Sequence, residues 1–272
     1  MIFTQTRALG DIKPRGRPRL NTNHPLGRGM VSGLLFNEAH ENTWEVRDSV
    51  YGREWTLIEG LGGGDRGEDR RGYFFRPNPT SQGIWASKDH FNIADYPFTL
   101  ACHFNATFVL NNLSPVMDIG NDSVVVNYAV ASSNDANDYV ALFTRNGGSS
   151  TDSSTIVMDG RHTAVGVWRS ATDRELFVDG KSAATGTASI AFNGNRFGLA
   201  GLVDSTPSQS WFSPIYWAYF YDRALSAHEA WDLHHRPYSM WLPGSTTVFM
   251  ETVGGVAPAA GLRTLATTGA GI

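Results

Sequence analysis

Apolar and polar side chains alternate along several segments of this chain. Between Phe98 and Ala106 the apolar side chains fall on every second position, and polar or small ones fall between them. A period of two is typical of a β-strand with one face in a core. The same pattern returns at 124–130 and 139–143, and loops rich in Ser, Asn, Asp and Gly follow at 132–138 and 146–154. The alternation predicts a sheet of short strands joined by polar loops.

Two later segments add detail to this picture. Asp179 and Gly180 stand between two short apolar runs, and an Asp-Gly pair at such a place predicts a tight type I′ hairpin. Residues 215–221 are apolar or aromatic at every position, so we expect both faces of that strand to be covered.

One segment carries the signals of a helix. Ser226 and Glu229 have the spacing of a capping box, in which each side chain bonds the backbone of the other, and Pro237 predicts the end of the helix. Many strands with one short helix predict an all-β sandwich or jelly roll in a single main domain.

The composition changes at both ends of the chain. We divide it into an N-terminal arm (1–24), a sandwich (25–241) and a C-terminal tail (242–272) rich in Gly, Ala and Thr. The arm has several cations against one acid, Asp11. These cations are Arg7, Lys13, Arg15, Arg17 and Arg19. Both ends lack the apolar groups to fold alone, so we predict extended arms that bind a partner.

Charge and cysteine content narrow the classes of function. The net charge of -4 argues against a protein devoted to nucleic acid, and the basic arm lacks aromatic residues between its cations. Cys102 is the single cysteine, which excludes an intrachain disulfide and favours a packed thiol. No stretch approaches the roughly 20 apolar residues of a membrane span, and we expect synthesis in a reducing cytoplasm.

The order of four segments resembles the laminin G-like domains of the concanavalin A-like class. Residues 161–168 and 175–181 resemble their paired strands, 215–229 resembles their closing strand and helix, and 29–38 is similar to their opening strand. Residues 24–29 and 236–241 resemble the versions found among structural proteins of tailed bacteriophages. The resemblance implies a concanavalin A-like β-sandwich (jelly roll) with one short C-terminal helix and extended arms.

The residues with catalytic chemistry do not form a known set. Asp65, Glu68 and Asp69 are interrupted by arginines and predict a solvated loop, whereas hydrolases of this fold carry their carboxylates on one strand face. No serine stands in a nucleophile elbow, and the histidines lack the spacing of metal ligands. We therefore predict no enzyme activity, no cofactor and no metal site.

Several aromatic residues fall in predicted loops or just beyond predicted elements. They are Trp85, Trp211, Phe212, Tyr238 and Trp241. Aromatic rings anchor interfaces and stack on sugars, and here core packing or a subunit interface is favoured over a sugar. We assign Trp211, Phe212, Tyr238, Trp241 and the five cations of the arm as candidate partner-binding residues.

These observations favour a non-enzymatic structural protein of a virion. The first hypothesis is a capsid decoration protein that binds the major capsid protein or other virion proteins, as a homo-oligomer such as a trimer. The alternative is a carbohydrate-binding module on a phage tail or fibre, with a host glycan as its partner.

Overall fold

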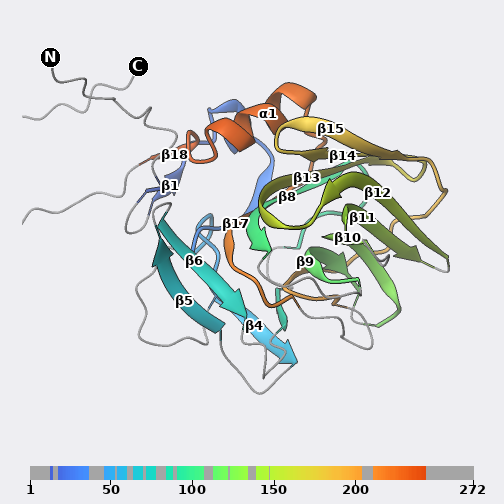
Figure 1. The fold of residues 1–272 in the computed structure, drawn as a ribbon, viewed down its shortest axis with the longest axis horizontal. Coiled ribbons are helices and arrows are strands. Elements are labelled where there is room, and N and C mark those ends of the chain that lie inside the picture. The colour runs from blue at the N-terminus through green and yellow to red at the C-terminus, as the bar shows by residue number, and fades with distance from the viewer. Residues whose placement is uncertain are drawn as a thin grey trace, which may run out of the picture.

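The computed structural model shows two packed antiparallel sheets. It describes residues 13–14, 18–36, 46–52, 54–59, 64–69, 72–77, 84–87, 91–106, 113–121, 123–133, 139–146, 148–203 and 211–242. Two eight-stranded sheets face each other across one core, and α1 (Ala227–His235) lies on the outside (Figure 1). The fold is an antiparallel β-sandwich with one short helix near its C-terminal end, as the alternating pattern predicts.

The sheet beneath α1, here called the helix-side sheet, has the strand order β15-β14-β13-β8-β17-β6-β5, and β2 also pairs with β17. Its strands are β2 (Met30–Leu34), β5 (Gly64–Asp69), β6 (Gly72–Pro77), β8 (Phe98–Ala106), β13 (Gly160–Ser170), β14 (Asp173–Val178), β15 (Lys181–Gly186) and β17 (Ile215–Tyr221).

The other sheet, here called the second sheet, has the strand order β12-β11-β10-β9-β16-β7-β4-β3. Its strands are β3 (Val46–Arg47), β4 (Glu54–Glu59), β7 (Ile84–Ser87), β9 (Pro115–Gly120), β10 (Val126–Ser132), β11 (Tyr139–Asn146), β12 (Ser149–Val157) and β16 (Arg196–Leu199).

The core lies between the sheets and contains the residues that the alternation selects. Phe98 of β8 stacks on Trp168 of β13 with ring centroids 5.1 Å apart, and both rings are fully buried. The indole Nε1 of Trp168 donates to Thr144 Oγ1 of the second sheet at 3.1 Å, which satisfies a polar group inside the core. Cys102 is buried as predicted, and this burial raises the pKa of its thiol, so it acts as a packing residue.

Both faces of β17 are covered, as its composition predicts. Phe220 and Ala218 point into the main core, whereas Trp217 and Tyr219 belong to a second apolar cluster with Leu233 of α1. A bulge between Ile215 and Trp217 shifts the register against β8, which increases the local twist.

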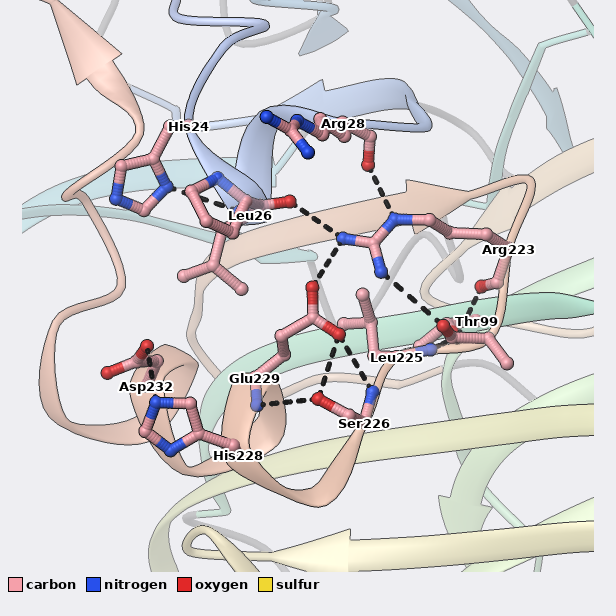
Figure 2. Close-up of polar contacts among 12 residues, drawn as sticks. His24, Leu26, Arg28, Thr99, Arg223, Leu225, Ser226, His228, Glu229 and Asp232 are labelled. Carbon is pink, nitrogen blue, oxygen red and sulfur yellow. Dashed lines mark hydrogen bonds and ion pairs between the residues drawn. The ribbon is translucent and has the colours of Figure 1, made fainter.

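The helix begins with the predicted capping box. Ser226 Oγ accepts a hydrogen bond from Glu229 N at 3.2 Å, and the Glu229 carboxylate accepts one from Ser226 N at 2.9 Å. Arg223 donates to Glu229 Oε1 at 2.7 Å and to the carbonyls of Pro25 and Arg28, both at 2.8 Å (Figure 2). The start of α1 is therefore tied to the 3₁₀ turn Pro25–Gly27.

The hairpin at Asp179 and Gly180 is also confirmed. Their φ values are +51° and +77°, the pair of positive angles that a type I′ turn requires.

Two expectations for local structure were wrong. The acidic segment with Asp65, Glu68 and Asp69 is not a loop: it lies in β5, an edge strand that pairs along its length with the aromatic strand β6. Pairing with a neighbouring strand overrides its weak intrinsic preference. Val124 lies before the start of β10 and is 42% exposed, so the strand is shorter at that end than the alternation suggests.

The described end of the N-terminal arm is joined to the end of the sandwich. Arg19 and Leu20 form β1, which pairs with Trp241 and Leu242 in β18 (Figure 1), and Asn21 N donates to Met240 O at 2.8 Å. Residues 1–12 and 243–272 lie outside the described residues. Within the described ranges, no helix is long and apolar enough to cross a membrane.

Candidate functional site

Four asparagines gather at one end of the second sheet, where four of its internal strands start or stop. β9 and β11 end there, at Gly120 and Asn146, and β10 and β16 begin there, because neighbouring strands are antiparallel. The asparagines lie in the last or first residues of these strands and in the adjoining loops. We call Asn121, Asn146, Asn193 and Asn195 the amide rim.

The amide rim is ordered by its own hydrogen bonds. Asn121 Nδ2 donates to the carbonyl of Asn193 at 2.8 Å, and Asn121 Oδ1 accepts from Ser123 N at 2.9 Å and from Asn195 Nδ2 at 3.3 Å. Asn195 N donates to the carbonyl of Gly120 at 2.8 Å. The loop 190–195 and the loop after β9 are thus fixed to each other before any ligand binds, and preorganisation lowers the entropic cost of binding.

An aromatic layer supports the loop 190–195 from below. Tyr128 Oη donates to the carbonyl of Ala191 at 2.6 Å and accepts from Asn193 N at 3.1 Å. Phe192 stacks on Tyr128 with centroids 5.2 Å apart, and Tyr96 Oη donates to the carbonyl of Ile190 at 2.6 Å. Burial raises the pKa of Tyr128 and of Tyr96, so both phenols keep the proton that they donate to the loop.

A row of polar residues continues from the rim across the outer face of the sheet. Arg145, Asn127, Gly120 and Arg196 are register partners on β11, β10, β9 and β16. Arg145 donates to Asn127 Oδ1 at 2.6 Å, and Asn127 Nδ2 donates to Asp118 Oδ2 at 3.0 Å. The sheet therefore carries two guanidinium groups next to the amide rim.

The outer part of the site combines amide groups with apolar side chains. Asn193 is exposed, and Val124 and Val125 of the neighbouring loop are 42% and 44% exposed. The Asn193 amide oxygen accepts from Asn121 Nδ2 at 3.3 Å and has a second lone pair, so this amide can still donate to one hydroxyl group and accept from another, while the valines match apolar C–H surface. The amide rim and the two valines can therefore bind a ligand rich in hydroxyl groups.

The described residues hold no group of three or more His, Cys, Asp or Glu side chains that could bind a metal ion. Asp118 of β9 is fully buried and accepts from Val203 N at 2.9 Å and from Tyr128 N at 3.1 Å. Its oxygens anchor the backbone.

Three of the predicted partner-binding residues pack inside the chain and not in the amide rim. Trp211, Tyr238 and Trp241 are 2%, 7% and 5% exposed and pack within the chain, which corrects their assignment as partner contacts. Trp211 packs edge-on against Phe104, and Trp241 Nε1 donates to Tyr219 Oη at 3.2 Å.

The cations of the arm differ in their burial and contacts. Lys13 is 7% exposed and its Nζ donates to the carbonyl of Tyr216 at 2.9 Å, so it is held by its own chain. Arg19 is exposed and Phe212 is half-buried, and partner binding through these two stays a prediction. Arg7, Arg15 and Arg17 lie outside the described residues.

No family model and no curated protein sequence matches this chain. Solved structures with the same fold include domain 4 of AbnA, a GH43 extracellular arabinanase from Geobacillus stearothermophilus, in complex with arabinotriose. Its TM-score is 0.60 at 12% identity, over 75% of this chain and 98% of that one. The fold is shared.

Two longer proteins also contain this fold. The binding domain of Paraclostridial Mosquitocidal Protein 1 matches with a TM-score of 0.54 at 13% identity, over 77% of this chain and 52% of that one. Trypanosoma rangeli sialidase in complex with sialic acid matches with a TM-score of 0.52 at 16% identity, over 78% of this chain. The match spans about a third (33%) of the sialidase chain. At these identities the likeness shows a common β-sandwich fold and nothing further.

Proposed function

We propose that this chain is a carbohydrate-binding domain without catalytic activity, and that it binds its glycan at the amide rim. The observation that carries the proposal is the convergence of Asn146, Asn193 and Asn195 at one end of the second sheet, held by the buried Asn121, with two arginines and two exposed valines close by in the fold. Amides and guanidinium groups together are suited to hydroxyl groups, and the valines to the apolar face of a sugar ring.

The similar solved structures support the proposal at the level of fold. They include a domain in complex with arabinotriose, a sialidase in complex with sialic acid and the binding domain of a mosquitocidal protein. A β-sandwich of this fold is therefore compatible with glycan binding, including as one domain of a longer protein.

The carboxylates support binding over catalysis. Glycosidases of the common type need two carboxyl groups about 5 Å or about 6.5–9.5 Å apart. The strands β9, β10, β11 and β16 contain one carboxylate, Asp118, and backbone and amide hydrogens already occupy its oxygens. We propose that glycan binds here without being hydrolysed.

Location in a virion, on the capsid lattice or on a tail fibre, stays a prediction from the sequence resemblance. So do the capsid partner and the trimer. Among the hypotheses drawn from the sequence, the carbohydrate-binding module fits the site better than the decoration protein, because the site is built for a small polar ligand.

A glycan array tests the proposal. We expect the purified chain to retain a defined set of glycans, and Asn193→Ala to weaken their binding about three- to tenfold, the range for one hydrogen bond. Asn23→Ala is the matched control, because Asn23 is an exposed asparagine far from the rim in sequence and fold. Retention of no glycan, or equal weakening by both variants, contradicts the proposal. Release of new reducing ends from a retained glycan contradicts its non-catalytic part.

A further inference from the structure

Three histidines and one aspartate meet where the end of α1 contacts the helix-side sheet. His103 lies on β8, His162 on β13 and His234 on α1, and Asp179 lies in the turn between β14 and β15. Thr163 stands at the centre: its Oγ1 is 3.1 Å from His103 Nδ1 and 3.2 Å from His234 Nδ1. This cluster shares no residue with the amide rim, so the inference drawn from it does not depend on whether a glycan binds at the rim.

The neighbours of His162 determine its protonation state. Its Nδ1 lies 2.9 Å from Asp179 Oδ2, and its Nε2 lies 3.0 Å from the carbonyl oxygen of Asp159. A carboxylate and a carbonyl can only accept hydrogen bonds, so both ring nitrogens must carry a hydrogen to satisfy them. The contacts around His162 therefore fit the imidazolium ion, and loss of either proton leaves two acceptors facing each other.

The neighbours of His234 fit a hydrogen on its Nδ1, which both the neutral and the protonated ring can carry. The Thr163 hydroxyl has one hydrogen and is flanked by two imidazole nitrogens, so one of these must donate to it. His234 Nδ1 also lies 3.6 Å from Asp179 Oδ1, which already accepts from Thr163 N at 2.9 Å. A hydrogen on His234 Nδ1 can bond Thr163 Oγ1 at 3.2 Å, whereas the 3.6 Å contact with Asp179 Oδ1 is electrostatic, so Asp179 lies between two imidazoles.

The position of the turn fixes the position of the helix end. A Cβ atom on Gly180 would lie 3.1 Å from Trp231 Cα and 3.4 Å from His234 Cβ, so the turn packs closely against α1 and leaves little room for a side chain between them. A shift of Asp179 is for this reason transmitted to the last turn of the helix.

We propose that His162, His234 and Asp179 form a proton-dependent clamp, which holds the C-terminal end of α1 on the β14–β15 turn at mildly acidic pH and releases it at alkaline pH. The described basic groups on the surrounding elements contact groups other than Asp179, so they do not supply the positive charge of protonated His162. Arg161 lies over the Tyr216 ring, Arg236 pairs with Asp232, and His235 Nδ1 contacts the carbonyl of Trp231. Asp159 adds a second negative charge beside His162.

The direction of the switch follows from the two ionisations. The hydrogen bond to Asp179 raises the pKa of His162 above 6.5, so its contribution is complete below that pH and is lost as the pH rises through the raised value. Burial alone would raise the pKa of Asp179, but hydrogen bonds from His162 and Thr163 outweigh burial and hold this pKa below 3.8. The clamp is therefore strongest between about pH 4 and pH 6.5.

Hydrogen exchange on the full-length chain tests the proposal. After correction for intrinsic exchange, we expect the protection of residues 226–240 to fall about two- to fivefold between pH 6 and pH 8.5, the range for one partly exposed ion pair. Asp179→Asn should abolish this fall, because asparagine accepts the positive φ of the turn but carries no charge. His228→Gln, at an exposed position of α1, should keep it.

An equal fall in the wild-type and Asp179→Asn chains overturns the clamp, and so does a wild-type chain with no fall. If Asp179→Asn does not fold, NMR titration of the His162 ring in the wild-type chain decides the question. The clamp requires a titration midpoint above 6.5, and a midpoint at or below 6.5 overturns it.

Discussion

At the scale of the residue, one buried charge joins the two sheets. The Arg174 guanidinium is 1% exposed, forms an ion pair with Asp152 of β12, and donates to Ala188 O and Ser150 Oγ, both at 2.8 Å. We expect Asp152→Ala to lower the free energy of unfolding by about 3 kcal/mol, because it leaves a charge buried without its partner.

Urea unfolding measures this effect. The control is Asp173→Ala, whose pair with Arg169 is largely exposed and contributes less than about 1 kcal/mol. Equal losses in the two variants would show that the Arg174 pair does not stabilise the contact between β12 and β14.

The positions of some residues in the fold could be predicted from the sequence, and those of others could not. Cys102 belongs to a clear alternation, so its burial was predictable. Arg174 follows a polar turn and has the local sequence of a surface residue, and only the long-range approach of β12 buries it. The four asparagines of the amide rim come from the loop after β9, the end of β11 and the loop before β16, and the sequence shows polar segments without showing that they converge. Trp211 lies outside any alternation, so the sequence favoured core packing or a subunit interface for it without deciding between the two.

At the scale of the element, the start of α1 depends on its cap. We expect Ser226→Ala to lower the free energy of unfolding by about 1 kcal/mol, because Glu229 N loses its acceptor. Ser226→Asn should keep nearly the full free energy of unfolding of the wild type, since asparagine caps helices as well as serine does. Thermal unfolding followed by circular dichroism measures both, and an equal loss in the two variants contradicts the role of the cap.

The same element gives a dependence on acid. Burial alone would raise the pKa of Glu229, but hydrogen bonds from Arg223 and Ser226 outweigh it and hold the pKa below 4.5. Its contribution is present above that pH and is lost as the pH falls through the lowered value. The Glu229→Gln chain should therefore lose less stability than the wild type between pH 5 and pH 3, as measured by urea unfolding. A loss of the same size in both chains would contradict this role of Glu229.

Local signals predicted the elements that local contacts determine. The capping box and the Asp179-Gly180 hairpin each lie within a few residues, and both are present. β5 was missed because its Gly and charged residues favour a loop, and its strand conformation comes from pairing with β6.

At the scale of the whole molecule, the order of segments predicted a sandwich, but not that the arm contributes to it. We expect deletion of residues 1–24 to lower the free energy of unfolding by about 1–3 kcal/mol. The deletion removes β1 and the buried hydrogen bond from Lys13 to Tyr216. Deletion of residues 1–12 is the control, because it keeps both contacts. Calorimetry compares the two chains, and an unchanged stability after the longer deletion would make the arm independent of the sandwich.

The central claim is that a glycan binds at the amide rim, and NMR mapping tests it most directly. The labelled chain is titrated with a glycan that the array selects, and the backbone amide shifts are followed. We predict that the largest changes fall at Asn121, at 123–125, at Asn146 and at 191–196, with little change along α1. Changes centred on α1 or on β1 and β18, or no changes at saturating glycan, would contradict the account.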